Sequence, residues 1–124
     1  MRVEQLYASI GGDYDEALKR LPSEEFVARF IVKFMDDPSC ADVVSSWRAG
    51  DENATFEAAH KAKGVCANLS LRKLADLASA ICEALRPGND ALREATDIDA
   101  LVDELDTAHH TTMDAIASFA SRGV

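Results

Sequence analysis

The residues best suited to chemistry lie in one short segment in the middle of the chain. His60 is followed by Lys63 and then by Gly64, a residue without a side chain. A neutral imidazole is a competent nucleophile near neutral pH. A neighbouring ammonium group favours the neutral ring, and it would stabilise the negative oxygens of a phosphoryl group attached to that ring. Phosphoryl transfer depends mainly on alignment and charge neutralisation, so these residue types favour that chemistry.

Helical geometry places His60 on the outer face of its segment. Each residue advances ~100° around a helix axis. Opposite His60 lies an apolar face made of Ala58, Ala62, Val65 and Leu69, flanked by Thr55 and Cys66. The face that carries His60 also carries Phe56, Glu57, Lys63, Gly64 and Ala67. We therefore expect the His60 side chain to be exposed to solvent and not buried in the core of its own domain.

The outer face also has the features of a docking surface. Gly64 costs ~1 kcal/mol relative to Ala inside a helix, and it lies one turn after His60, with Ala67 one turn further on. These small residues leave room for the backbone of another protein. Phe56 is expected to be an exposed aromatic residue, a type that is enriched in interfaces. We assign partner docking to Phe56, Gly64 and Ala67, together with Lys61 beside the histidine.

Apolar periodicity and capping signals predict helices along nearly the whole chain. The expected helices span residues 3–10, 14–20, 24–36, 39–49, 52–69, 71–85 and 97–119, with a loop at 89–96 that has room for one helical turn. The expected N-caps are Asp13, Ser23, Asp51, Ser70 and Thr96. The expected core-facing residues of the third helix are Phe26, Val27, Phe30, Ile31 and Phe34.

These elements predict an all-α fold. Long helices joined by short connections favour an antiparallel four-helix bundle, here over residues 23–121. The short helices within residues 1–21 would cover one end of the bundle. We find no repeat and no linker, so we expect residues 1–124 to form a single domain.

Composition and charge limit the classes of function. The 124 residues include 22 acidic and 13 basic residues, for a net charge of −9, which counts against binding to nucleic acids or anionic membranes. No uncharged stretch approaches the ~20 residues of a membrane-spanning helix, and the N-terminus lacks the apolar core of a signal peptide. Three cysteines without C-x-x-C spacing indicate neither a disulfide framework nor a zinc site. We expect a cytoplasmic monomer.

The string AHKAKGVCANL, residues 59–69, resembles the signature of histidine-containing phosphotransfer (Hpt) domains. In that family the pattern is H-x-[small or apolar]-K-G, followed by small residues and a helix break. The similarity continues outside the motif. Residues 10–37 are similar to the N-terminal part of the family, and LRKLADLASAICEAL, residues 71–85, is similar to the helix that packs after the phosphorylated one.

The resemblance implies a four-helix bundle that carries a phosphoryl group on His60. Lys63 would neutralise that group, and Gly64 would allow a partner to approach closely. The family exchanges phosphoryl groups with aspartates of response-regulator receiver domains, often between a hybrid sensor histidine kinase and a final regulator. No cofactor is implied on this chain, and Mg²⁺ is expected only on the partner receiver domain.

Two positions depart from the family pattern. Many members have a Gln on the following helix that hydrogen-bonds the phosphorylated histidine, and the nearest equivalents here are Ser79 and Cys82. Position 62 is Ala, where Leu or Ile is common, which suggests a tighter helix contact or a small packing gap. Neither departure removes the nucleophile.

Two other classes of function remain open. The chain has no Walker A or kinase-type glycine-rich loop, so we expect a phosphoryl carrier and not a kinase. One alternative is a helical interaction module without phosphate chemistry. The other is a metal site, because Glu57 and His60 have the Glu-x-x-His spacing of di-iron bundles, with a weaker match at Asp106 and His109. Such sites point inward, however, and nearby lysines would repel a dication.

The chain begins with Met and reads as one module, so we expect a freestanding carrier. A domain excised from a larger hybrid kinase would have the same sequence features.

Overall fold

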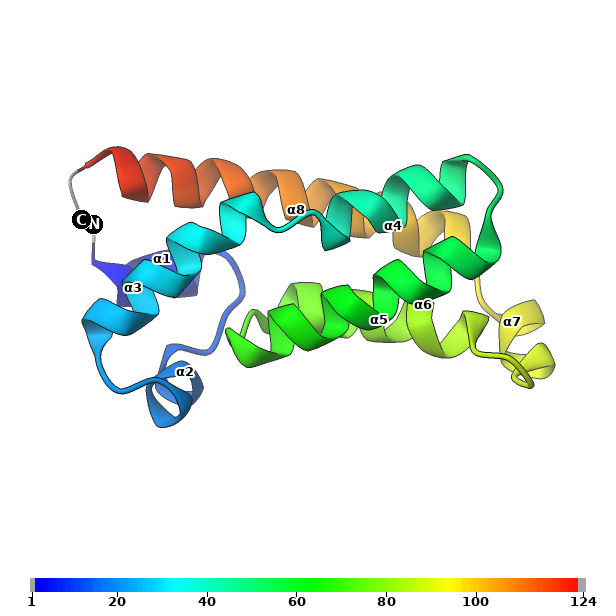
Figure 1. The fold of residues 1–124 in the computed structure, drawn as a ribbon, viewed down its shortest axis with the longest axis horizontal. Helices are drawn as coiled ribbons and strands as arrows, with labels where there is room; N and C mark the ends of the chain where they lie inside the picture. Colours follow the sequence, from blue (N-terminus) through cyan, green and yellow to red (C-terminus); the bar gives the residue numbers. More distant parts are fainter. Residues whose placement is uncertain (1, 123–124) are drawn as a thin grey trace.

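The computed structural model describes residues 2–122, and this part of the chain is all-α without a strand, as predicted. Figure 1 shows the helices in sequence order. They are α1 (Val3–Ser9), α2 (Tyr14–Arg20), α3 (Glu24–Lys33), the 3₁₀ turn η1 (Phe34–Asp36), α4 (Ser39–Arg48), α5 (Glu52–Asn68), α6 (Arg72–Leu85), α7 (Asp90–Ala95) and α8 (Ile98–Ser121).

Four helices frame the core. α5 packs against α4 and α6, and α8 packs against the same two helices from the other side (Figure 1). The largest fully buried side chains inside this frame include Val43, Leu74, Ile81, Leu105 and Ile116. α1 and α3 pack against α8, while α2 contacts α1 and α3. α5 therefore has neighbours on two sides, and its remaining face is free to carry exposed residues.

The buried face of α5 is made of small residues. They are Thr55, Ala58, Ala59, Ala62 and Cys66. Short side chains let neighbouring helices approach closely, and Ala62 is fully buried among them. The buried face is turned slightly from the predicted one, because Ala59 is fully buried and Val65 is only half-buried. His60 still lies opposite the core, as the helical periodicity predicted.

A set of hydrogen bonds holds the C-terminal end of α5. The Tyr7 hydroxyl donates to the carbonyl of Leu69 at 2.8 Å, and both groups are buried. The backbone N–H of Asp13 donates to the carbonyl of Ser70 at 2.8 Å. The Arg20 guanidinium donates to the carbonyl of Ala67. Residues from α1 and α2 thus lock the turn between α5 and α6, which fixes the axis of α5.

Local capping signals predicted three helix starts correctly and two incorrectly. The side chains of Asp13, Ser23 and Asp51 accept hydrogen bonds from backbone N–H groups of their helices, as expected. Ser70 is not a cap: its φ is 56°, and its hydroxyl donates to Glu16 because the locked turn brings these side chains together. The cap of α8 is Asp97, one residue after the predicted Thr96.

Two other expectations are corrected. Val27, Ile31 and Phe34 are buried, but Phe26 and Phe30 are each 37% exposed. The two exposed rings stack on each other, with centroids 6.2 Å apart, because α3 contacts the rest of the molecule along a narrower face than its apolar pattern suggests. Residues 89–96, expected to be a loop with room for one helical turn, contain the short helix α7 over Asp90–Ala95.

Candidate functional site

His60 lies at the middle of α5, and its side chain is exposed. Asp51 starts this helix by accepting a hydrogen bond from the backbone N–H of Ala54 at 3.0 Å. The opposite side of α5 is buried against α4 and α6. The imidazole therefore sits on a rigid element whose position is fixed by packing, while the ring itself can be reached from solvent.

The strip that follows His60 on the outer face is open. A Cβ atom built on Gly64 would have no heavy atom within 4 Å, once the neighbouring residues and the backbone of its own helix are set aside. Ala67, one turn further on, is half-buried, and Lys61 is exposed. The strip therefore has open space beside the helix at Gly64.

Lys63 is half-buried beside His60, and its ammonium group has a partner on α6. The distance from Lys63 Nζ to Glu83 Oε1 is 3.9 Å. This is an ion-pair distance that exceeds the range of about 2.7 to 3.2 Å for an N–H···O hydrogen bond. The ammonium group is therefore close to the carboxylate but does not form a hydrogen bond with it.

Phe56 differs from the expectation of a freely exposed aromatic residue. Its side chain is half-buried and packs against the core. Its ring lies nearly parallel to that of His60, with centroids 6.4 Å apart and an interplanar angle of 25°. The guanidinium carbon of Arg86 lies 5.6 Å from the Phe56 centroid, within cation–π range. Phe56 thus connects the imidazole of α5 with a cation at the end of α6.

The sequence prediction missed Glu83 and Arg86. Arg86 Nη2 donates to Glu83 Oε1 at 2.8 Å, and Arg86 Nε donates to Glu83 Oε2 at 3.2 Å. Hydrogen bonding from Arg86 lowers the pKa of the Glu83 carboxyl, and the carboxylate raises the pKa of the guanidinium in return. The i,i+3 spacing of opposite charges was the one signal available for this pair. Its proximity to His60 follows from the packing of α6 on α5.

Ser79 and Cys82, the expected support on the second helix, have other surroundings. Ser79 is half-buried, and Cys82 is buried, which raises the pKa of its thiol. The polar contact of the Cys82 sulfur is with Arg86 Nη2, at 3.9 Å. Among residues 2–122, no hydrogen bond joins either residue to His60. The charged groups of α6 that contact neighbours of His60 on α5 belong to Glu83, beside Lys63, and to Arg86, beside Phe56.

The second histidine of interest, His109 on α8, lies in a different environment. Its side chain is half-buried, with the ring edge-to-face against Phe34 at a centroid distance of 6.2 Å. Its Nε2 atom is buried without a hydrogen-bond partner among the described residues. Burial is the main reason that the pKa of His109 is lowered, and nearby His110 acts in the same direction.

The metal-site alternative requires ligands that gather at one place inside the bundle. Within residues 2–122, His, Cys, Asp and Glu side chains nowhere gather in a group of three or more that could hold a metal ion. Glu57 and His60 are both exposed and do not point into the bundle. None of the helices in the described part of the chain has the length and apolarity that crossing a membrane requires.

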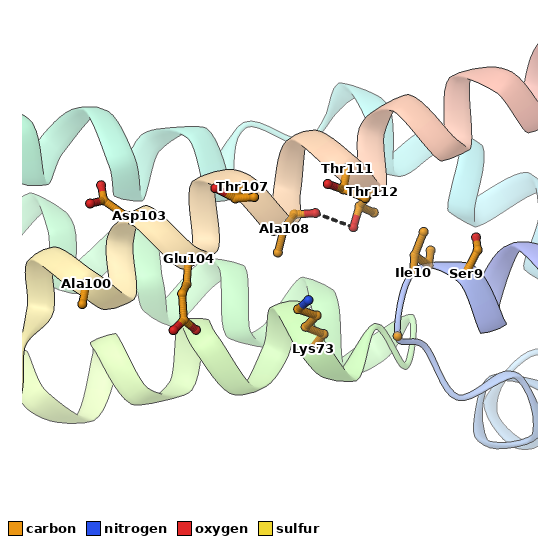
Figure 2. A pocket seen from close by; sticks show the side chains of 11 residues that line it. Ser9, Ile10, Lys73, Ala100, Asp103, Glu104, Thr107, Ala108, Thr111 and Thr112 are labelled. Carbon is orange, nitrogen blue, oxygen red and sulfur yellow. Dashed lines mark hydrogen bonds between the residues drawn. The ribbon is translucent and has the colours of Figure 1, made fainter.

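A separate groove lies between the C-terminal end of α1, α6 and α8. Figure 2 shows that residues such as Lys73, Glu104 and Thr107 line it. Its volume is about 670 Å³. Thr112 turns its hydroxyl back to the carbonyl of Ala108 at 2.8 Å, so this group satisfies the helix backbone. None of the predicted site residues lines this groove.

The comparison with protein families gives a match that covers well over half of the chain. The family model described as "Hpt domain" matches residues 25–111. The matched region runs from the start of α3 into α8, and it includes His60, Lys63 and Gly64. No curated protein and no solved structure matches the chain significantly.

Proposed function

Because the chain belongs to the Hpt domain family, whose members carry out histidine phosphotransfer in phosphorelays, we propose that His60 is the residue that carries the phosphoryl group. One observation supports this assignment above the others. His60 is exposed at the centre of a packed helix, and Lys63 and the open Gly64 lie about one turn further along the same helix. These are the groups that the transfer needs from the accepting protein.

The proposed reaction is a reversible transfer between a receiver aspartate and this histidine. A lone pair on the neutral imidazole attacks the phosphorus atom of the aspartyl phosphate. The bond from phosphorus to the carboxyl oxygen breaks, the aspartate leaves as a carboxylate, and a nitrogen–phosphorus bond forms. Passing the group to a second receiver reverses these changes. Lys63 stabilises the phosphoryl oxygens, which are negative throughout.

The donor would be the receiver domain of a hybrid sensor histidine kinase, and the acceptor would be a response regulator. We propose that Phe56, Lys61, Gly64 and Ala67 form the docking surface for both. Gly64 matters most, because the space above it lets the receiver backbone approach the imidazole. The Mg²⁺ that receiver chemistry uses would be held by the receiver domain, and no cofactor is assigned to this chain.

The rest of the fold serves as the support for this face. We propose that residues 23–121 form an antiparallel four-helix bundle, in which α4, α5, α6 and α8 pack on one another, and that the short helices α1 and α2 cover one end of it. We also propose that the chain works as a single domain, as a monomer and in the cytoplasm. Gel filtration with light scattering at working concentrations tests the oligomeric state directly.

Phosphorylation by a receiver domain tests the proposed function. The protein is incubated with receiver domains that carry labelled aspartyl phosphate, and the modified residue is identified. We expect a label that is stable to base, labile to acid, located on His60 and absent from His60→Gln. If the wild-type protein takes no label from a full set of receivers of its organism, the interaction-module alternative replaces this proposal. Binding of iron or manganese that is lost in His60→Ala would support the metal alternative.

A further inference from the structure

The carboxylate of Glu83 contacts two cationic side chains, those of Arg86 and Lys63. Its bidentate contact with Arg86 has distances of 2.8 and 3.2 Å, which are ordinary charge-assisted hydrogen bonds. Its contact with Lys63 is longer, at 3.9 Å. The three side chains are between 39% and 41% exposed, so solvent can reach all of them.

The backbone around Glu83 is also fixed. The carbonyl of Glu83 accepts a hydrogen bond from Asn89 Nδ2 at 3.0 Å and one from the backbone N–H of Arg86 at 3.3 Å. These contacts hold the last turn of α6 and keep the carboxylate beside α5. Because hydrogen bonding from Arg86 lowers its pKa, Glu83 carries its negative charge throughout the neutral pH range.

A phosphoryl group on His60 would add negative charge near this carboxylate and would need Lys63 as its counter-ion. Glu83 can release Lys63 without being left unpaired, because Arg86 satisfies both of its oxygens. Lys63 can move at low cost, because its contact with Glu83 is longer than a hydrogen bond. The same ammonium group can thus exchange one anionic partner for the other.

We propose that Glu83 is a positioning residue that competes with the phosphorylated His60 for Lys63, and that it thereby limits how much of the phosphoryl group this protein retains. The inference rests on the proposed phosphocarrier function and adds a residue to it. Before transfer, Glu83 keeps the ammonium group beside the imidazole. After transfer, the attraction of Glu83 for Lys63 leaves the phosphoryl group less completely neutralised, and this favours its departure to the next receiver.

The measurement is the equilibrium between the phosphorylated protein and a phosphorylated receiver domain that labels the wild type. Glu83→Gln removes the charge and keeps the shape of the side chain. We expect this variant to shift the equilibrium toward phosphorylated His60 by about threefold to tenfold at low ionic strength, with most of the shift lost near ~1 M salt. Glu83→Ala should shift it in the same direction, which guards against a fault specific to the glutamine.

A double-mutant cycle separates competition for Lys63 from other effects of the carboxylate. In a Lys63→Ala background, Glu83→Gln should leave the equilibrium nearly unchanged, because the shared ammonium group is gone. Glu57→Gln is the matched control. It makes the same charge change on the His60 face, and Glu57 takes part in no ion pair among residues 2–122.

Each outcome decides the proposal. An unchanged or reduced share of phosphorylated His60 in Glu83→Gln overturns it, and so does a shift that persists in the Lys63→Ala background. An equal shift in Glu57→Gln also overturns it, because the effect would then be general electrostatics. If the wild type itself takes no label, the phosphocarrier function fails. If the wild type is labelled and Glu83→Gln behaves identically, only the role of Glu83 fails.

Discussion

The outer face of α5 differs from its C-terminal end in how closely the rest of the chain approaches. We call the C-terminal region the joint: it is the turn between α5 and α6 with the groups of Tyr7, Asp13 and Arg20 that hydrogen-bond to it. The space around two glycines, Gly64 and Gly12, shows the difference. A Cβ atom on Gly64 would meet nothing within 4 Å, whereas a Cβ atom on Gly12 would lie 2.6 Å from Tyr7 Cδ2 and 3.3 Å from the carbonyl oxygen of Ser70. One glycine leaves space beside the helix, and the other allows two segments to touch.

The comparison shows how one helix can combine a fixed position with an open surface. At the joint, residues far apart in the sequence satisfy the backbone where α5 ends, as the bond from Tyr7 to Leu69 illustrates. On the outer face, His60, Lys61 and Gly64 are all exposed to solvent. Stability and function should therefore respond to substitutions in separate places, which the following variants test.

The largest expected effect is a complete loss of phosphoryl acceptance in His60→Gln. The side chain is exposed, and its ring neighbour Phe56 is held by its own packing against the core, so the free energy of unfolding should change by less than about 0.5 kcal/mol. Labelling by a phosphorylated receiver and chemical denaturation measure the two quantities. His110→Gln, at another exposed histidine, should keep full acceptance. A loss of more than about 1 kcal/mol in His60→Gln would mean that the outer face is part of the structural core.

Gly12→Ala should produce the opposite result at the joint. The new methyl group would overlap the fully buried Tyr7 ring, which would have to shift. We expect a loss of about 2 to 3 kcal/mol in the free energy of unfolding, near the upper end for overpacking. The fraction that remains folded should accept a phosphoryl group at the wild-type rate. A neutral effect on stability would show that the joint can relax.

Tyr7→Phe tests the hydrogen bond at the same joint. Removal of the hydroxyl leaves the buried carbonyl of Leu69 without this donor, at a cost of about 1 to 2 kcal/mol. Urea denaturation provides the measurement. Tyr14→Phe is the control, because the Tyr14 ring packs edge-to-face on Tyr7 at 5.8 Å but its side chain is only half-buried. Equal effects of the two variants would mean that loss of hydroxyl groups in general, and not the bond to Leu69, lowers stability.

Gly64→Ala should stabilise the isolated protein and impair its interaction. Alanine is favoured over glycine within a helix by roughly 0.5 to 1 kcal/mol, and nothing nearby obstructs the added methyl group. The same group would occupy the space above α5 and slow transfer from the receiver, with Gly64→Leu slowing it further. The sign of the stability change is therefore opposite to that of Gly12→Ala. A destabilised Gly64→Ala would contradict the open strip.

Local signals in the sequence predicted much of this arrangement. The helices, the caps at Asp13 and Asp51, and the exposure of His60 all follow from interactions within a few residues of one another. The same reasoning failed for Ser70, whose left-handed backbone conformation depends on a joint built from distant segments. It also failed for Phe26, because apolar periodicity cannot say which apolar residues of a helix find a neighbour.

The part of the candidate site that lies on α5 was predictable from the sequence, and the part that lies on α6 was not. The motif around His60 lies on one helix, so its spacing alone places Lys63 and Gly64 beside the histidine. Glu83 and Arg86 lie on the following helix, and their position depends on how α6 packs against α5. Composition and spacing carry no information about that packing. The place of Glu83 and Arg86 in the candidate site therefore became visible only in the structure.

The smallest expected effect concerns pH, and it contrasts the two histidines. The pKa of His109 is lowered by burial, with His110 acting in the same direction and Asp106 and Asp37 opposing it. Below a pH of about 6.5, the unfolded chain therefore binds more protons at His109 than the folded chain does. The free energy of unfolding consequently falls as the pH decreases toward the lowered pKa of His109. Denaturation from pH 7.5 to 5.5 should show this loss in the wild type and a smaller loss in His109→Gln. Parallel pH profiles would show that the protonation of His109 is not linked to folding.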